Sequence, residues 1–213
     1  PPTSGPADAY RRQLQAHGGE RYVAILFADI RGFTSISEGR LPYDVVFLLN
    51  RYFRATGQAV QAAGGRLDKF IGDGVMAIFG LNSEPQIACR QALDAARRMA
   101  LALDDLNEAL SGDLDQPLRI GIGLHAGPAI VGEMGFERTS SLTAIGDTVN
   151  TASRLETLTK DFAVELVVSQ DLLDRAGTDL PAAAHHEVEI RGRHGRLAVR
   201  AVARASDLTS LSS

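Results

Sequence analysis

The sequence is poor in cysteine and aromatic residues, and it contains no long apolar run. It has one cysteine among 213 residues, Cys89, so an internal disulfide is excluded and a reducing compartment such as the cytoplasm is expected. Cys89 falls in a helical pattern and is interpreted as a small core residue. No segment approaches the roughly 18 consecutive apolar residues of a membrane span, and no signal peptide is visible. We therefore expect a cytoplasmic chain with no membrane contact of its own, although a full-length protein could be membrane-anchored.

A basic excess is also missing. The formal net charge is −4 and the sequence pI is about 5.7. Proteins that bind nucleic acid need clustered positive charge to displace counterions from phosphates, so a nucleic-acid partner is not expected. An anionic substrate would have to be met locally, by metals and a few placed cations.

Three regions are expected along the chain. Residues 1–20 are predicted to be a linker followed by an N-terminal signalling helix at 7–16, because the chain begins Pro-Pro-Thr-Ser-Gly-Pro. With 45% hydrophobic residues, residues 21–204 can form one globular domain, and residues 205–213 are predicted to be a tail. We infer a domain cut from a longer protein, with an upstream regulatory or sensor domain.

The hydrophobic periodicities predict strands and helices that alternate irregularly, with several hairpins. This order favours an α+β fold, with a mixed or mainly antiparallel sheet covered by helices, over a doubly wound parallel sheet. The predicted strands are 22–28, 67–71, 75–79, 118–125, 129–133, 140–145, 162–168, 186–190 and 197–202, with a turn at 126–128; the predicted helices are 43–63, 85–110, 148–159 and 170–176.

Two aspartates lie where predicted strands run into tight turns. Asp29 ends the buried strand 22–28, and Asp73 lies between two glycines in the hairpin that joins 67–71 to 75–79. A lone Asp after a strand usually caps a helix or turn. Two such carboxylates together are suited to Mg²⁺, which prefers oxygen ligands and shares phosphate oxygens with its protein site.

Groups that could bind phosphate, either backbone N–H groups or polar side chains, follow two of the predicted strands. Gly32, Phe33 and Thr34 can open a helix whose backbone N–H groups face phosphate oxygens. Asn150 and Arg154 are four residues apart and share a helical face, where they could hold a ribose oxygen and a charged phosphoryl group. The alternative is an exposed polar face on which Arg154 pairs with Glu156 or Asp147.

These segments, residues 27–34, 68–80 and 143–156, together resemble the signature of the class III nucleotidyl cyclases, the adenylyl and guanylyl cyclase catalytic domain. The resemblance spans roughly residues 21–203 and implies the class III cyclase fold with its ferredoxin-like core. By the same resemblance, Asp29 and Asp73 would bind two Mg²⁺ or Mn²⁺ ions in each active site. The backbone carbonyl of Ile30 would be a further metal ligand. Asn150 and Arg154 would be the catalytic pair.

Two positions that select the base in this family fall on Lys69 and Thr143. Lys69 can donate to adenine N1, and the Thr143 hydroxyl can accept from the exocyclic amine. This pair predicts ATP as substrate and 3′,5′-cyclic AMP and pyrophosphate as products. A guanylyl cyclase and a catalytically silent nucleotide-binding regulatory domain remain the alternatives.

The resemblance also implies a homodimer with composite sites, in which the metals and the Asn/Arg pair belong to opposite subunits. The segment 190–196 is similar to the family's Lys-Gly-Lys-Gly segment, which makes Arg191 a candidate contact to the triphosphate, although the spacing departs by one residue after Arg193. A solvated basic turn is the alternative. Residues 135–141 are predicted to form a dimerisation arm, with Phe136 either as an interface anchor or as an ordinary loop hydrophobe.

Overall fold

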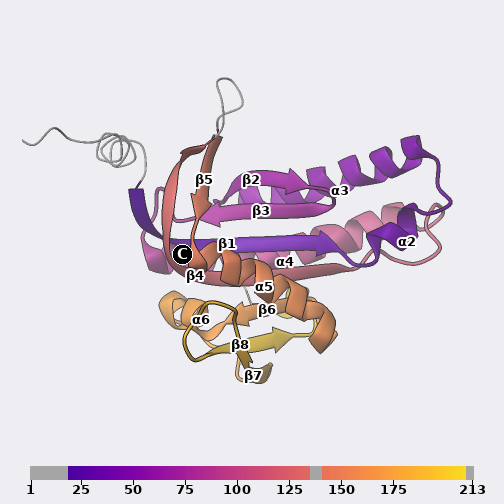
Figure 1. Cartoon of the computed structure of the whole chain (residues 1–213). Coiled ribbons are helices and arrows are strands. Elements are labelled where there is room, and N and C mark those ends of the chain that lie inside the picture. The colour runs from indigo at the N-terminus through magenta and orange to yellow at the C-terminus, as the bar shows by residue number, and fades with distance from the viewer. Residues whose placement is uncertain (1–18, 135–140, 210–213) are drawn as a thin grey trace, which may run out of the picture.

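The computed structural model describes residues 19–134 and 141–209 (Figure 1). The strands are β1 (Gly19–Ile30), β2 (Arg66–Ile71), β3 (Gly74–Phe79), β4 (Ile120–Met134), β5 (Ser141–Ile145), β6 (Leu166–Ser169), β7 (Ala184–Glu189) and β8 (Arg196–Val202). The helices are α2 (Phe33–Ser37), α3 (Pro42–Ala62), α4 (Pro85–Ala109), α5 (Asp147–Phe162) and α6 (Gln170–Ala176), and a 3₁₀ turn η2 (Ala205–Asp207) follows β8. The predicted helix 7–16 and residues 135–140 of the predicted dimerisation arm lie outside the described residues.

The strands form one sheet in the order β2-β3-β1-β4-β6-β8-β7, and β5 pairs with β4. β4 and β6 run parallel, and the other paired strands run antiparallel. The expected α+β fold with a mixed, mainly antiparallel sheet is therefore confirmed. The parallel β4–β6 step needs a crossover, and the connection that includes α5 supplies it.

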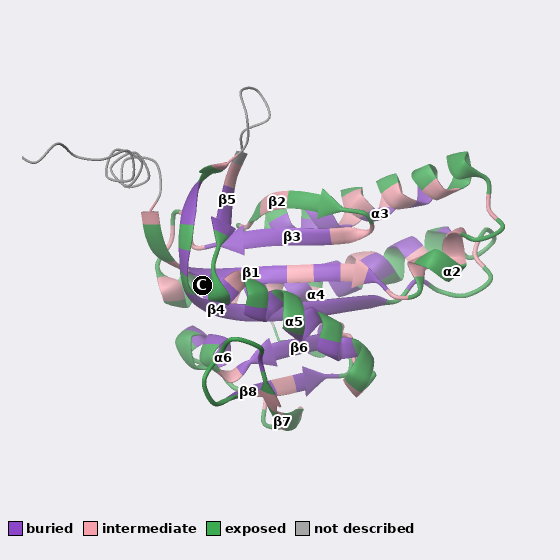
Figure 2. Ribbon diagram, viewed as in Figure 1, coloured by how far each residue is buried: buried purple, intermediate pink, exposed green. Residues whose placement is uncertain are grey.

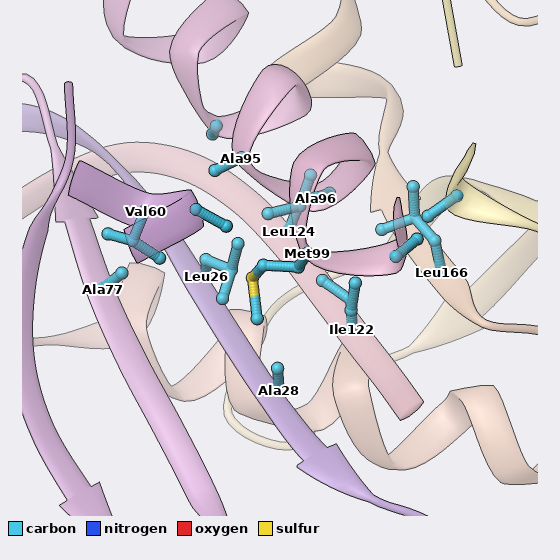
Figure 3. Close-up of a cluster of buried hydrophobic side chains, with 14 of the residues drawn as sticks. Leu26, Ala28, Val60, Ala77, Ala95, Ala96, Met99, Ile122, Leu124 and Leu166 are labelled. Atoms are coloured by element: carbon cyan, nitrogen blue, oxygen red, sulfur yellow. The ribbon is translucent and has the colours of Figure 1, made fainter. Parts of the chain in front are cut away.

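Helices cover both faces of the central strand β1. Leu26 and Ala28 point into a cluster with Val60 of α3 and Met99 of α4, which Figure 3 shows together with neighbouring residues of β3, β4 and β6. The alternate residue Ile25 belongs to a second cluster that includes Ala152 of α5. Because the middle of β1 is buried on both faces, residues 22–28 form a continuous apolar run rather than an alternating one. Figure 2 shows this part of β1 in the buried and intermediate colours.

α5 lies very close to β4. A Cβ atom at Gly123 would collide with the backbone of Ala152 and Glu156 in α5. Only a glycine therefore allows the helix to approach the strand at this point. This contact sets the position of α5, which carries both Asn150 and Arg154.

One predicted turn is absent. The segment 126–128 was expected to separate two strands, but β4 runs unbroken from Ile120 to Met134, and Pro128 pairs with Tyr22 of β1. The carbonyl of Pro128 accepts a hydrogen bond from Thr148 Oγ1 at 2.6 Å, so this residue's polar groups face away from β1. Its missing N–H therefore removes no bond of the β1–β4 ladder, and the proline is tolerated.

The strand predicted at 162–168 begins later than expected. α5 continues to Phe162 and ends at Ala163, whose φ of 52° is left-handed, and β6 covers only Leu166–Ser169. Phe162 and Val164 are apolar because they pack against the cluster that contains Leu155. Their hydrophobicity reflects packing of a helix end, and not membership of the strand. The other predicted elements agree to within a few residues.

α4 is the longest helix and lies against the sheet. Cys89 is fully buried in its inner face, as predicted. Neither α4 nor any other helix among residues 19–134 and 141–209 combines the length and the apolar character needed to cross a bilayer.

Candidate functional site

Asp29, Ile30 and Asp73 meet at one end of the sheet. β3 pairs with β1 through Ala28 and Val75, so the turn of the β2–β3 hairpin lies beside the end of β1. Gly72 supports this turn with a φ of 58°. The backbone N–H of Ile30 donates to Asp73 Oδ2 at 3.0 Å. Asp73 is thus brought to the adjacent residues Asp29 and Ile30, although it follows Ile30 by 43 positions in the sequence.

The surroundings of Asp29 suit a cation. Its Oδ1 atom is buried and accepts no hydrogen bond from the described residues. Burial, and then the charges of Asp29, Asp73 and Glu156, raise the pKa of the Tyr52 hydroxyl well above its usual range. An unsatisfied buried carboxylate oxygen among other carboxylates is relieved by a bound divalent ion. The residues present therefore fit the Mg²⁺ or Mn²⁺ that the cyclase signature implies.

No group of three or more His, Cys, Asp or Glu side chains is placed to hold a metal ion within the described parts of the chain. A metal at Asp29 and Asp73 would therefore complete its coordination with backbone, water or substrate oxygens. Mg²⁺ usually keeps such ligands when it binds nucleoside triphosphates.

Glu156 was not singled out from the sequence as part of this site. Its side chain is buried on the inner face of α5 beside Asp29, and burial followed by the Asp29 carboxyl raises the pKa of Glu156 above its usual range. A signal existed, because Glu156 lies four residues after Ala152 and one after Leu155, both buried. A carboxyl on the apolar stripe of a helix is unusual and therefore marks a candidate site residue.

Arg31 also approaches the carboxylates. Its guanidinium donates to the carbonyl of Val164 at 2.5 Å, and its backbone N–H donates to the backbone carbonyl of Arg119 at 2.7 Å. Its positive charge lowers the pKa of Glu156, although burial and Asp29 outweigh it. Arg31 thus holds the segment after β1 in place while partly compensating the acidic cluster.

The predicted phosphate-binding turn forms a very short helix. α2 begins at Phe33 and spans five residues, and Gly32 precedes it in a left-handed conformation with φ of 64°. No side chain caps the helix start. Gly32, Phe33 and Thr34 therefore present backbone N–H groups from a single turn, with little support from a helix dipole.

Lys69 and Thr143 converge on a carboxylate that the sequence reasoning did not use. Thr143 Oγ1 donates to Asp68 Oδ2 at 2.6 Å, and Lys69 Nζ lies 3.4 Å from the same oxygen. The Asp68 side chain is 1% exposed, whereas that of Lys69 is 46% exposed. The two residues predicted to select the base, 74 positions apart, are thus neighbours in one chain.

Asn150 and Arg154 both lie on the exposed face of α5, as their spacing predicts. Among the ion pairs of residues 19–134 and 141–209, none joins Arg154 to Glu156 or Asp147, so the alternative interpretation finds no support. Arg154 and Arg191 line one cavity of about 910 Å³, together with Glu189, Ile190, Arg193, Gly195 and Arg196. Four guanidinium groups around one cavity suit a polyphosphate.

The cationic and acidic groups of the site face different ways. Arg154 and Glu156 are two residues apart on α5, which rotates one from the other by about 200°. Glu156 is buried beside Asp29, whereas Arg154 is exposed and borders a cavity that neither Asp29 nor Asp73 lines. Within one chain, Arg154 and the candidate metal ligands are therefore not directed at a common point.

Comparisons with known proteins identify relatives of this chain. The chain is 40% identical over 157 residues to a protein named adenylate cyclase from Anabaena cylindrica, an alignment that covers 72% of this chain and 30% of that protein. It is 38% identical over 158 residues to the terminal-differentiation-specific adenylate cyclase of Dictyostelium discoideum, covering 74% of this chain and 7% of that protein. The chain therefore spans less than a third of the length of these relatives.

Two solved structures share the fold over nearly their whole length. The guanylyl cyclase Cya2 superposes with a TM-score of 0.80 at 32% identity, covering 92% of this chain and 98% of that one. The adenylyl cyclase CyaB from P. aeruginosa superposes with a TM-score of 0.75 at 26% identity, covering 89% and 98%. The family described as the adenylate and guanylate cyclase catalytic domain matches residues 16–201. The chain therefore belongs to the class III nucleotidyl cyclase family.

Proposed function

We propose that this chain is an adenylyl cyclase domain that converts ATP to 3′,5′-cyclic AMP and pyrophosphate. The family contains both adenylyl and guanylyl cyclases, so the substrate depends on the base-selecting residues. The observation that carries the proposal is the convergence of Lys69 and Thr143 on Asp68. This pair offers one donor and one acceptor, which match N1 and the 6-amino group of adenine. The names of the relatives from Anabaena and Dictyostelium agree with this choice.

Each polar residue has a separate task in this reaction. Asp29, Asp73 and the carbonyl of Ile30 would hold two Mg²⁺ or Mn²⁺ ions. Such ions lower the pKa of the ribose 3′-hydroxyl and neutralise charge on the triphosphate. Asn150 orients the ribose so that its 3′-oxygen is in line with the α-phosphorus.

The phosphate groups are met by cations and backbone donors. Arg154 donates to the α-phosphoryl oxygens, where negative charge develops in the transition state. Arg191 contacts the far end of the triphosphate, and Gly32, Phe33 and Thr34 contribute backbone N–H groups. The shared cavity of Arg154 and Arg191 supports this division, because both cations can reach one polyphosphate chain.

We propose further that the active unit is a homodimer with two composite sites. The opposite directions of Arg154 and Glu156 on α5 support this assembly, because Arg154 can face the Asp29 and Asp73 of a second copy but not those of its own chain. Exposed apolar residues on and before α3 and on the β2–β3 hairpin supply a surface for the contact; they are Leu41, Tyr43, Val46, Phe47, Phe70 and Ile71.

The greater length of the relatives supports a role for this chain as the output domain of a larger signalling protein. A solved bacterial light-regulated adenylyl cyclase shares the fold with a TM-score of 0.70 at 27% identity, and the match covers 55% of that chain. An upstream regulatory domain in the cytoplasm would then control how the two catalytic halves meet.

A product assay tests the proposal. Purified protein is incubated with ATP or GTP and with Mg²⁺ or Mn²⁺, and the cyclic nucleotide is identified by mass. We expect cyclic AMP in clear excess over cyclic GMP. Preferential turnover of GTP would favour the guanylyl cyclase alternative, which the similarity to Cya2 keeps open. Nucleotide binding without turnover by the dimer would favour a silent regulatory domain.

A further inference from the structure

Asp68 has no task in the reaction proposed above, but its buried carboxylate contacts both Thr143 and Lys69. We propose that Asp68 is a specificity-determining positioning residue, which fixes the direction of the hydrogen bond that Thr143 offers to the base and tethers Lys69 beside it. This inference rests on the proposed selection of adenine by Lys69 and Thr143. Asp68 itself does not touch the nucleotide.

A β-bulge aims the Asp68 side chain. Leu67 pairs with Ala77 and Lys69 pairs with Met76, so Asp68 is the extra residue of β2 at this point. A bulge breaks the alternation of side chains along a strand and redirects the residue it inserts. Here it buries the carboxylate against β5, where Thr143 lies, while Lys69 keeps an exposed side chain. The bulge therefore couples two elements at the base-selecting position.

The carboxylate determines what the Thr143 hydroxyl can do. A hydroxyl has one proton to donate and lone pairs that accept, whereas a carboxylate only accepts. The Thr143 hydroxyl donates a hydrogen bond to Asp68 Oδ2 at 2.6 Å. The hydroxyl oxygen can then only accept from the base. An accepting hydroxyl oxygen can pair with the 6-amino group of adenine, whereas it is repelled by the lone pairs of guanine O6.

The ammonium group of Lys69 only donates hydrogen bonds, so the contact to Asp68 sets its position and not the direction of its bonds. Its Nζ lies 3.4 Å from the oxygen that Thr143 uses, so both side chains are held by one atom. A donor and an acceptor held side by side reproduce the N1 and 6-amino pattern of adenine. Without Asp68, Thr143 could rotate its proton outward and Lys69 would lose its tether.

The test measures kcat/KM for ATP and for GTP in the full chain. Asp68→Asn keeps the shape of the side chain, but its amide can donate to Thr143, which frees the hydroxyl proton to point at guanine O6. We expect the ratio of kcat/KM for ATP to that for GTP to fall on the order of tenfold or more, because the donor and the acceptor of a buried hydrogen bond are exchanged. If the Asn variant does not fold, Asp68→Ser replaces it, and we expect the same fall in the ratio. Asp68→Glu still only accepts hydrogen bonds, so its preference for ATP should stay closer to that of the wild type than in either other variant.

A double-mutant cycle separates this role from a structural one. In a Thr143→Val background no hydroxyl remains to be directed, so Asp68→Asn should change the ratio far less than in the wild-type background. Asp94→Asn is the matched control, because Asp94 also binds two cations, Arg97 at 2.9 Å and Arg98 at 2.7 Å, but lies on α4. Its ATP:GTP ratio should equal that of the wild type. Equal losses for both nucleotides in Asp68→Asn would overturn the inference.

The same data distinguish failure of the inference from failure of the proposed function. A wild-type protein that prefers ATP and loses this preference in Thr143→Val, but keeps it in both Asp68→Asn and Asp68→Ser, overturns the role of Asp68 and leaves the proposed function standing. A wild-type protein without preference for ATP, or a Thr143→Val variant with an unchanged ratio, overturns the assignment of the base-selecting pair and with it the inference.

Discussion

The backbone N–H of Ile30 donates to the carboxylate of Asp73 at 3.0 Å, which holds the turn of the β2–β3 hairpin against the end of β1. One aspartate therefore has two tasks, since it is both a proposed metal ligand and an anchor of the turn. Because Asp73 Oδ2 is already oriented by this bond, the site is partly organised before any metal binds.

Two variants of Asp73 should separate these tasks. Asp73→Asn keeps an oxygen that can accept from Ile30 but removes the charge, so we expect near-normal thermal stability and a loss of several decades in cyclic AMP production. Asp73→Ala should lose activity similarly and also lose about 1 kcal/mol of stability, because the N–H of Ile30 is left without its partner. Denaturant unfolding and a cyclic AMP assay give both readouts. Wild-type turnover by Asp73→Asn would refute the metal assignment.

Mixing two inactive variants tests the composite site. Asp73→Ala and Arg154→Ala homodimers should each be inactive, but a mixed dimer keeps one undamaged site if the two residues act from different subunits. With random exchange, an equal mixture should recover about one quarter of the wild-type activity. Subunit exchange is verified with differently tagged chains. Chains that exchange without recovering activity would place the whole site within one subunit.

Gly123 should be intolerant of even a methyl group. In Gly123→Ala the new Cβ meets the backbone of Ala152 and Glu156, and a backbone cannot move aside as a flexible side chain can. We expect a loss of about 1–3 kcal/mol in the free energy of unfolding and reduced activity, because α5 carries Asn150 and Arg154. Gly112→Ala is the matched control, since a Cβ there has no neighbour within 4 Å. Equal stability of the two variants would contradict the close packing of α5 on β4.

His125 should make the protein less stable in mild acid. It is 3% exposed, its Nδ1 lies 2.7 Å from Ser169 Oγ, and burial lowers its pKa from 6.5 to about 4, although the carboxylates of Asp171 and Asp147 oppose the shift. The unfolded chain then binds a proton near pH 6.5 that the folded chain binds only near pH 4, so stability falls as the pH decreases through this window.

The effect of His125 can be isolated by substitution. Linkage sets an upper limit of about 3 kcal/mol on the loss between these two pH values. His125→Gln removes the titrating group, so its unfolding free energy should depend less on pH than that of the wild type in denaturant titrations. His185→Gln, at an exposed position, is the control and should follow the wild type. Parallel pH profiles for His125→Gln and the wild type would refute the lowered pKa.

The local pattern of the sequence determined most of the elements and the order of the motifs. The apolar run that ends at Asp29 predicts a buried strand, and the glycines around Asp73 predict a hairpin turn, because both signals depend on neighbouring residues alone. The spacing of Asn150 and Arg154 predicts a shared helical face for the same reason. The structure agrees with all three local features, and the comparisons show the family that their order suggested; the roles of these residues remain predictions.

Only the tertiary structure decided which groups meet. The bulge at Asp68 depends on how β2 pairs with β3, and the pairing of Asp68 with Thr143 depends on where β5 lies. The burial of Glu156 beside Asp29 depends on α5 packing on β4 at Gly123. Pro128 continues a strand because its polar groups face away from β1. Phe162 belongs to the end of α5 and not to β6, and it is apolar because it packs against the cluster that contains Leu155. These features depend on contacts between residues far apart in sequence, which local periodicity does not encode.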